Sequence, residues 1–205
     1  MEFAVDVIDP APLVGDALGL LAAPTGKAFR IRERVQSWMY YDIESAFSTD
    51  VVVLRGELRD HVPAALKVRA LTRLQVRTVV LLDKERAAAR RRLLSEGAAA
   101  VLASDVSLTN LKTVIERAAQ LAEPAPASAM SPELTDREMQ IACLFAGRAS
   151  PTTQHIGELL NLSPETVRRH LQRARLALRR AQFSASSRDE LRTSLLESGL
   201  LFPDS

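Results

Sequence analysis

Residues 163–180 (SPETVRRHLQRARLALRR) decide how the C-terminal part of this 205-residue chain is interpreted. Ser163 is a favourable N-cap, and Pro164 follows it at the first helical position, where a missing N–H costs no hydrogen bond. No glycine or second proline interrupts the rest of the stretch. The pattern therefore predicts one uninterrupted helix about 25 Å long.

The two sides of this predicted helix differ in chemistry. Helical periodicity places four apolar residues on one narrow stripe: Val167, Leu171, Ala174 and Leu178. The opposite arc carries six arginines and one amide: Arg168, Arg169, Gln172, Arg173, Arg175, Arg179 and Arg180. A solvated charged face is the ordinary alternative, but such faces interleave glutamate for i,i+4 pairing, and here Glu165 lies in the first turn, where it suits the helix dipole. An arginine face of this kind favours phosphate groups and base edges.

Composition limits the class of protein. The chain is 47% hydrophobic and 25% charged, as in ordinary globular proteins, and its length allows two domains. Because the formal net charge is only +2, any nucleic-acid signal is local. A single cysteine, Cys143, excludes an internal disulfide and is expected to be buried. No run approaches 18 apolar residues and no signal peptide is recognised, so we expect a cytoplasmic protein without a membrane partner.

Residues 1–122 alternate between strand and helix patterns. Short apolar, β-branched runs predict strands at residues 3–9, 29–35, 50–54, 79–82 and 98–103, the second of them at an edge because of its charges. Helical spacing follows at residues 13–21, 36–47, 64–74, 86–95 and 108–121. Five such alternations predict an α/β domain with a doubly wound, five-stranded parallel sheet.

Residues 123–132 (EPAPASAMSP) read as a short linker, and residues 133–205 predict a small all-α domain. Thr135 and Glu138 form a capping box before one helix, and Ser187 and Glu190 form another before the last helix. Between them, a helix ending at Leu160 is followed by a short turn and the basic helix. This order is the plan of a helix-turn-helix.

The C-terminal motifs resemble the LuxR/NarL-type DNA-binding domain over about residues 131–202. The resemblance is carried by Leu134-Thr135-x-Arg137-Glu138, Ile156, Leu160, Leu162-Ser163, residues 166–171 (TVRRHL) and the closing residues 187–191 and 199–201. The turn at residues 149–155 (ASPTTQH) is about two residues longer than is usual in that family. Residues 166–180 also resemble region 4 of extracytoplasmic-function sigma factors.

The N-terminal half resembles a response-regulator receiver, with Asp9-Pro10-Ala11-Pro12-Leu13-Val14 in the place of its first loop. The resemblance implies a phosphate-accepting aspartate after the third strand, a second acid beside Asp9, a hydroxyl after the fourth strand and a lysine after the fifth. Those positions hold Arg55, Pro10, Leu82 and Ser104. A guanidinium group cannot attack a phosphoryl group, and one carboxylate is a poor Mg²⁺ site. We expect a degenerate pocket, or pseudo-receiver, without phosphotransfer, metal or cofactor.

Arg55 has two alternative positions. Either its side chain points into the old acidic pocket and pairs with Asp9, or it extends into solvent. The acids Glu57, Asp60 and Asp83 follow strands at the same edge, where open α/β sheets bind ligands, although loop acids are usually only solvated.

These patterns predict a sequence-specific transcription regulator, not an enzyme, whose partner is double-stranded DNA. Arg168 and Arg169 are best placed for base edges, with Gln172 and Arg173 one turn further along. We expect Ser163 and Thr166 to hold phosphates at the helix N-terminus. Arg175, Arg179 and Arg180 are expected to contact the DNA backbone.

One helix-turn-helix domain contacts only a short stretch of DNA, so we expect a homodimer on two half-sites. The resemblance places candidate dimer contacts on the last helix, at Leu191, Leu195 and Leu196, although some of these leucines must pack inside the domain. A regulatory ligand or partner protein on the pseudo-receiver would replace phosphorylation. Two alternatives stay open: an RNA-polymerase-associated factor like sigma region 4, and a protein-binding module whose pseudo-receiver sequesters a partner.

Overall fold

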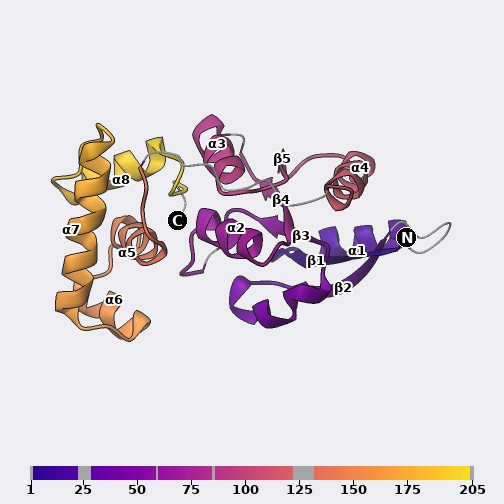
Figure 1. Cartoon of the computed structure of the whole chain (residues 1–205), viewed down its shortest axis with the longest axis horizontal. Coiled ribbons are helices and arrows are strands. Elements are labelled where there is room, and N and C mark those ends of the chain that lie inside the picture. The colour runs from indigo at the N-terminus through magenta and orange to yellow at the C-terminus, as the bar shows by residue number, and fades with distance from the viewer. Residues whose placement is uncertain (1, 23–28, 59, 85, 122–131, 204–205) are drawn as a thin grey trace. The chain divides into compact units, whose positions relative to one another are not determined.

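The chain forms two compact units in a computed structural model, which describes residues 2–22, 29–58, 60–84, 86–121 and 132–203. One unit contains a β-sheet, and the other contains four C-terminal helices (Figure 1). The predicted linker, residues 123–132, lies outside the described residues except for Pro132. The domain borders at residues 122 and 133 therefore stay a prediction.

The sheet has five parallel strands in the order β2-β1-β3-β4-β5. The strands are β1 (Phe3–Ile8), β2 (Phe29–Val35), β3 (Val51–Arg55), β4 (Arg77–Leu82) and β5 (Ala100–Ala103). The four residues of β3 before Arg55 are fully buried, which explains their continuous apolar run, because a central parallel strand is covered on both faces. The charged strand β2 lies at an edge, as predicted.

Helices cover both faces of the sheet (Figure 1). They are α1 (Pro12–Ala22), α2 (Ala64–Arg73), α3 (Ala87–Ser95) and α4 (Leu108–Ala119). Leu18 of α1 and Ile115 of α4 share one buried core with valines of β1, β3 and β4. Residues 67–73 of α2 and 93–95 of α3 belong to the same unit as the sheet. This arrangement confirms the predicted α/β class.

The helix predicted over residues 36–47 is wrong. The structure has two short 3₁₀ helices there, η1 (Trp38–Tyr40) and η2 (Ile43–Ser48). Each begins at its own cap: the side chain of Ser37 accepts a hydrogen bond from the N–H of Met39, and that of Asp42 accepts one from Glu44. Tyr41 between them is extended, so a single α-helix cannot form.

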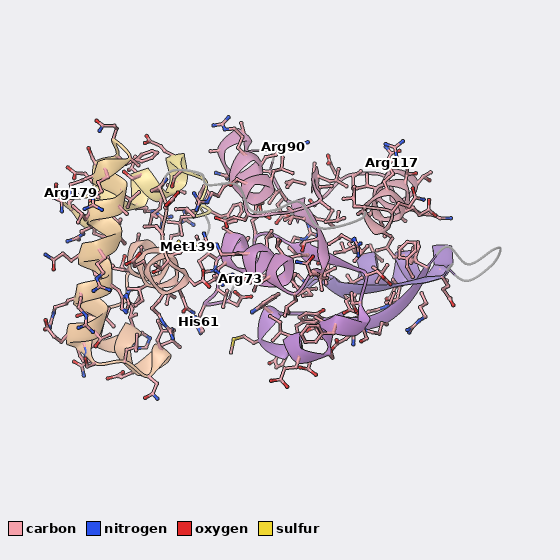
Figure 2. All side chains as sticks on the ribbon, viewed as in Figure 1. His61, Arg73, Arg90, Arg117, Met139 and Arg179 are labelled. Atoms are coloured by element: carbon pink, nitrogen blue, oxygen red, sulfur yellow. The ribbon has the colours of Figure 1, made fainter. Side chains whose placement is uncertain are left out.

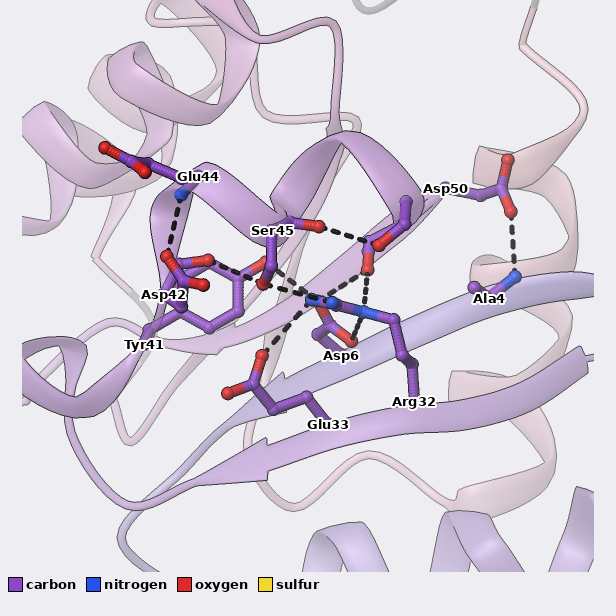
Figure 3. A network of polar contacts seen from close by, with 11 residues as sticks. Ala4, Asp6, Arg32, Glu33, Tyr41, Asp42, Glu44, Ser45 and Asp50 are labelled. Atoms are coloured by element: carbon purple, nitrogen blue, oxygen red, sulfur yellow. Dashed lines mark hydrogen bonds and ion pairs between the residues drawn. The ribbon is translucent and has the colours of Figure 1, made fainter.

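A buried polar network ties this 3₁₀ segment to the sheet (Figure 3). The fully buried carboxylate of Asp6 on β1 accepts hydrogen bonds from Arg32 Nε (2.9 Å), Tyr41 Oη (2.8 Å) and Thr49 Oγ1 (2.5 Å). Arg32 also donates from Nη1 to Ser45 Oγ. Burial and the hydrogen bond to Asp6 raise the pKa of Tyr41, which stays protonated. The carboxylate is thus compensated by a cation and two hydroxyl groups.

The second unit consists of α5 (Asp136–Ala146), α6 (Thr153–Leu160), α7 (Pro164–Arg180) and α8 (Arg188–Glu197). Both predicted capping boxes are present, at Thr135 with Glu138 and at Ser187 with Glu190. Cys143 lies in the core between these helices, and burial raises the pKa of its thiol to about 12. In the described part of the chain, no helix is both long and apolar enough to cross a membrane.

Two of the three predicted dimer contacts are wrong. Leu191 and Leu195 on α8 are 0% exposed and belong to the core of the helical unit, so they cannot meet a second chain. Leu196 is partly buried and packs against the same core. The leucines of α8 thus serve the packing of the four helices.

Candidate nucleic-acid interface

The turn between α6 and α7 sets the start of the basic helix. Asn161 ends α6 in the left-handed conformation (φ 53°), which asparagine tolerates. A Cβ atom at Gly157 would lie 2.5 Å from the carbonyl oxygen of Leu162, so only glycine allows the turn to pass this close to α6. Two residues then suffice to reach Ser163.

Ser163 caps α7 as the sequence predicts. Its Oγ accepts a hydrogen bond from the N–H of Thr166 at 3.1 Å, and the two hydroxyl groups lie 2.9 Å apart. Both hydroxyls therefore already have a partner in the free protein. Pro164 has no N–H, and the N–H groups of Thr166 and Val167 donate to Ser163. A phosphate at this helix terminus would therefore meet the N–H of Glu165 first.

The sides of α7 match the predicted division. Val167, Leu171, Ala174 and Leu178 are buried. Most of the predicted DNA-contacting side chains are exposed: Ser163, Arg168, Arg169, Gln172, Arg173, Arg179 and Arg180. Figure 2 shows Arg179 on the side of α7 that faces away from Met139 of α5. A row of guanidinium groups thus faces outward from a helix that is anchored by its apolar stripe.

Arg168 has a partner that the sequence interpretation missed. Its Nη1 lies 2.9 Å from Glu165 Oε2, one turn earlier on α7. The two side chains are 60% and 82% exposed, and an exposed pair of this kind contributes about 0–1 kcal/mol. Arg168 can therefore exchange Glu165 for a stronger acceptor at little cost.

Thr166 and Arg175 differ from the other predicted contacts because both are partly buried. The guanidinium carbon of Arg175 lies 5.8 Å from the centre of the Phe145 ring on α5. Leu176, 45% exposed, is a large apolar side chain on the arginine face.

A second polar cluster lies where β1, β3 and β4 end. Arg55 Nη2 lies 2.9 Å from Asp9 Oδ2, and Arg55 Nε donates to the same oxygen at 3.1 Å. Arg55 Nη1 reaches Asp83 Oδ1 at 2.6 Å, and Asp9 Oδ1 accepts the N–H of Ala11. Of the two predicted positions of Arg55, the structure shows the inward one.

The other positions of the expected degenerate pocket are Pro10, Leu82 and Ser104. Pro10 is exposed, Leu82 is buried, and Ser104 donates its backbone N–H to the carbonyl of Leu82 at 2.7 Å. Glu57, which the sequence suggested for a ligand site, accepts the N–H of Asp83 with both oxygens at 3.1 Å. Burial raises the pKa of Glu57. The pocket is thus closed by contacts among its own residues.

Comparison with known proteins identifies the fold. No protein-family model and no curated protein matches the sequence. RcsB from Salmonella enterica serovar Typhimurium, bound to the rprA promoter in the presence of phosphomimetic BeF3⁻, is similar in structure with a TM-score of 0.59. It is 13% identical, over 96% of this chain and 99% of that one. The fold is that of a response regulator.

Two further structures agree. RcsB on the P1flhDC promoter gives a TM-score of 0.50 at 15% identity, over 97% of this chain and 98% of that one. The response-regulator domain of Thermotoga maritima CheB gives 0.50 at 16% identity, over 59% of this chain and 98% of that one. At identities this low the likeness in structure shows the fold alone, and the chemistry has to be argued from the residues of this chain.

Proposed function

We propose that this protein is a sequence-specific DNA-binding transcription regulator of the NarL/LuxR response-regulator type, and not an enzyme. The observation that carries the proposal is the outward arginine face of α7, fixed to the core by the opposite stripe. A helix about 25 Å long with such a face fits the major groove of DNA. The structures of RcsB on two promoters support this use of the fold.

The positions along α7 suggest separate roles. Arg168 and Arg169 lie near the start of α7 and would read base edges, followed by Gln172 and Arg173. Arg179 and Arg180, in the last turn, would bind backbone phosphates. The N-terminus of α7, with Ser163 and Thr166, would receive another phosphate.

The regulator would act without phosphorylation. A receiver needs a carboxylate nucleophile and acids for Mg²⁺, whereas here the Arg55 guanidinium is paired with Asp9 and Asp83. A ligand or a partner protein at the pseudo-receiver would then supply the signal. We place the pseudo-receiver at residues 1–122, a linker at 123–132 and the DNA-binding domain at 133–205.

Binding to adjacent half-sites requires two modules, so we propose a homodimer. Of the three leucines suggested for its interface, only Leu196 keeps an accessible surface. The dimer contacts must therefore come mainly from other residues.

The test is selection of bound fragments from genomic DNA with the purified chain, followed by titration of the enriched fragment by fluorescence anisotropy. The proposal expects an enriched motif of two half-sites about one helical turn apart, bound about 10³-fold or more tighter than random DNA. Absence of enrichment at low salt would refute it. Binding to core RNA polymerase without binding to free DNA would favour the sigma-like alternative.

A further inference from the structure

Two guanidinium groups of the helical unit lie against one aromatic ring. The guanidinium carbon of Arg188, at the start of α8, is 3.9 Å from the centre of the Phe145 ring, and that of Arg175 is 5.8 Å from the same centre. Both distances are within the reach of cation–π attraction. Phe145 thus brings together side chains of α7 and α8 that are far apart in sequence.

Arg188 is held firmly in this position. Its Nη1 donates to the carbonyl oxygen of Ser150 at 3.1 Å and its Nη2 to that of Pro151 at 3.0 Å. Ser150 has a positive φ of 45°, which is unusual for serine. Arg188 therefore stabilises the longer turn between α5 and α6 while its guanidinium plane stays on Phe145.

Arg175 is partly buried beside Phe145, and its guanidinium group is not fully hydrogen-bonded. Its Nε is buried and has no hydrogen-bond partner among the described residues. Within the same described ranges, neither Arg175 nor Arg188 forms an ion pair with a carboxylate. Two like charges beside one ring repel each other. An anion bound at the terminal nitrogens of Arg175 would offset this repulsion.

We infer that Arg175 binds a phosphate of the DNA backbone and that Phe145 and Arg188 are its positioning residues. The inference rests on the proposed DNA binding, since it assigns one contact within that interface. A planar guanidinium group matches phosphate geometry, and the contact with Phe145 reduces the conformational entropy that Arg175 loses on binding. Arg175 differs in this respect from Arg180, which is exposed on the same helix.

A double-mutant cycle tests the inference by fluorescence anisotropy on the selected DNA. Phe145→Leu removes the aromatic face, so it should weaken binding by about two- to five-fold in the otherwise unchanged chain, as expected for the loss of one cation–π contact. In the Arg175→Ala background it should have no further effect. In the matched Arg180→Ala background the full two- to five-fold loss should return.

Further readouts separate positioning from general destabilisation. Phe145→Trp keeps an aromatic face and should keep the affinity, while thermal unfolding reports whether each variant is folded. Arg175→Ala should also reduce the slope of log affinity against log salt by about one unit. Equal losses from Phe145→Leu in all three backgrounds would overturn the inference alone. Failure of the unchanged chain to bind any DNA would overturn the proposed function, and this inference with it.

Discussion

The guanidinium group of Arg55 forms an ion pair with Asp9, with 2.9 Å between Nη2 and Oδ2. The side chains are 11% and 1% exposed, so the pair lies almost out of contact with water. In a phosphate-accepting receiver a bound metal cation would balance the acids at this edge. Here the Arg55 guanidinium group, which is part of the chain, is the cation that balances the negative charge of Asp9 and Asp83.

This pairing predicts that small phosphodonors do not act on the protein. Incubation with acetyl phosphate and Mg²⁺ should leave both the intact mass and the DNA affinity unchanged, because Arg55 offers no carboxylate nucleophile. Mass spectrometry and anisotropy measure the two quantities. A phosphorylated Asp9 or Asp83, accompanied by tighter DNA binding, would show that the pocket is still a switch.

The Asp6 network should contribute strongly to stability. Asp6→Ala leaves the Arg32 guanidinium without its main partner in a site where Asp6 was fully buried, and we expect a loss of about 3–5 kcal/mol in the free energy of unfolding. Asp16→Ala is the matched control, since Asp16 pairs with Arg34 of the same strand but is 61% exposed. Its loss should stay below about 1 kcal/mol.

Urea unfolding measures the free energy of unfolding of both variants. Similar losses for Asp6→Ala and Asp16→Ala would contradict the structural role given to the network. A change in the slope of unfolding against urea would instead indicate an altered unfolded state.

Glu57 gives a pH-dependent prediction. Burial raises the pKa of Glu57 above its ordinary value near 4.5, so the folded chain binds this proton more tightly than the unfolded chain. The resulting stabilisation is present below that ordinary pKa and is lost as the pH rises through the raised pKa. The stability of the unchanged chain relative to Glu57→Gln should therefore fall as the pH rises above the ordinary pKa near 4.5. A rising difference above that pKa would mean that the hydrogen bonds from Asp83 dominate instead.

Arg168 and Arg179 should affect DNA binding differently. If Arg168 forms two hydrogen bonds with a guanine, Arg168→Ala costs about 1–3 kcal/mol and relaxes the preference at one base position. Arg179→Ala should weaken binding to all sequences alike and reduce the salt slope by about one unit. Titrations with specific and random DNA at several salt concentrations compare the DNA affinities of the two variants. Equal effects of the two substitutions on both DNAs would show that the roles are wrongly assigned.

Most helices and strands could be predicted because their signals, such as caps and apolar runs, depend on residues that are neighbours in the sequence. Ser163 followed by Pro164 marked the start of α7, and the buried apolar run ending at Leu54 marked β3. The segment after β2 was missed because Ser37 and Asp42 each begin a separate turn, which helical periodicity does not reveal.

The site was predicted less completely than the fold. The pair between Glu165 and Arg168 follows from i,i+3 spacing and could have been recognised. The stack of Arg188 on Phe145 joins residues 43 positions apart (188 − 145), and only the folded core brings them together. The burial of Leu191 likewise depends on how four helices pack, since one apolar face serves equally for a core or an interface.

Guanine N7 methylation interference on the selected DNA tests the central claim most directly, because N7 lies in the major groove. The account predicts that methylated guanines in each half-site block binding of the unchanged protein, and that Arg168→Ala loses this interference at one position per half-site. Binding that is indifferent to methylation, with unchanged affinity when Arg168 is replaced, would contradict the placement of α7 in that groove.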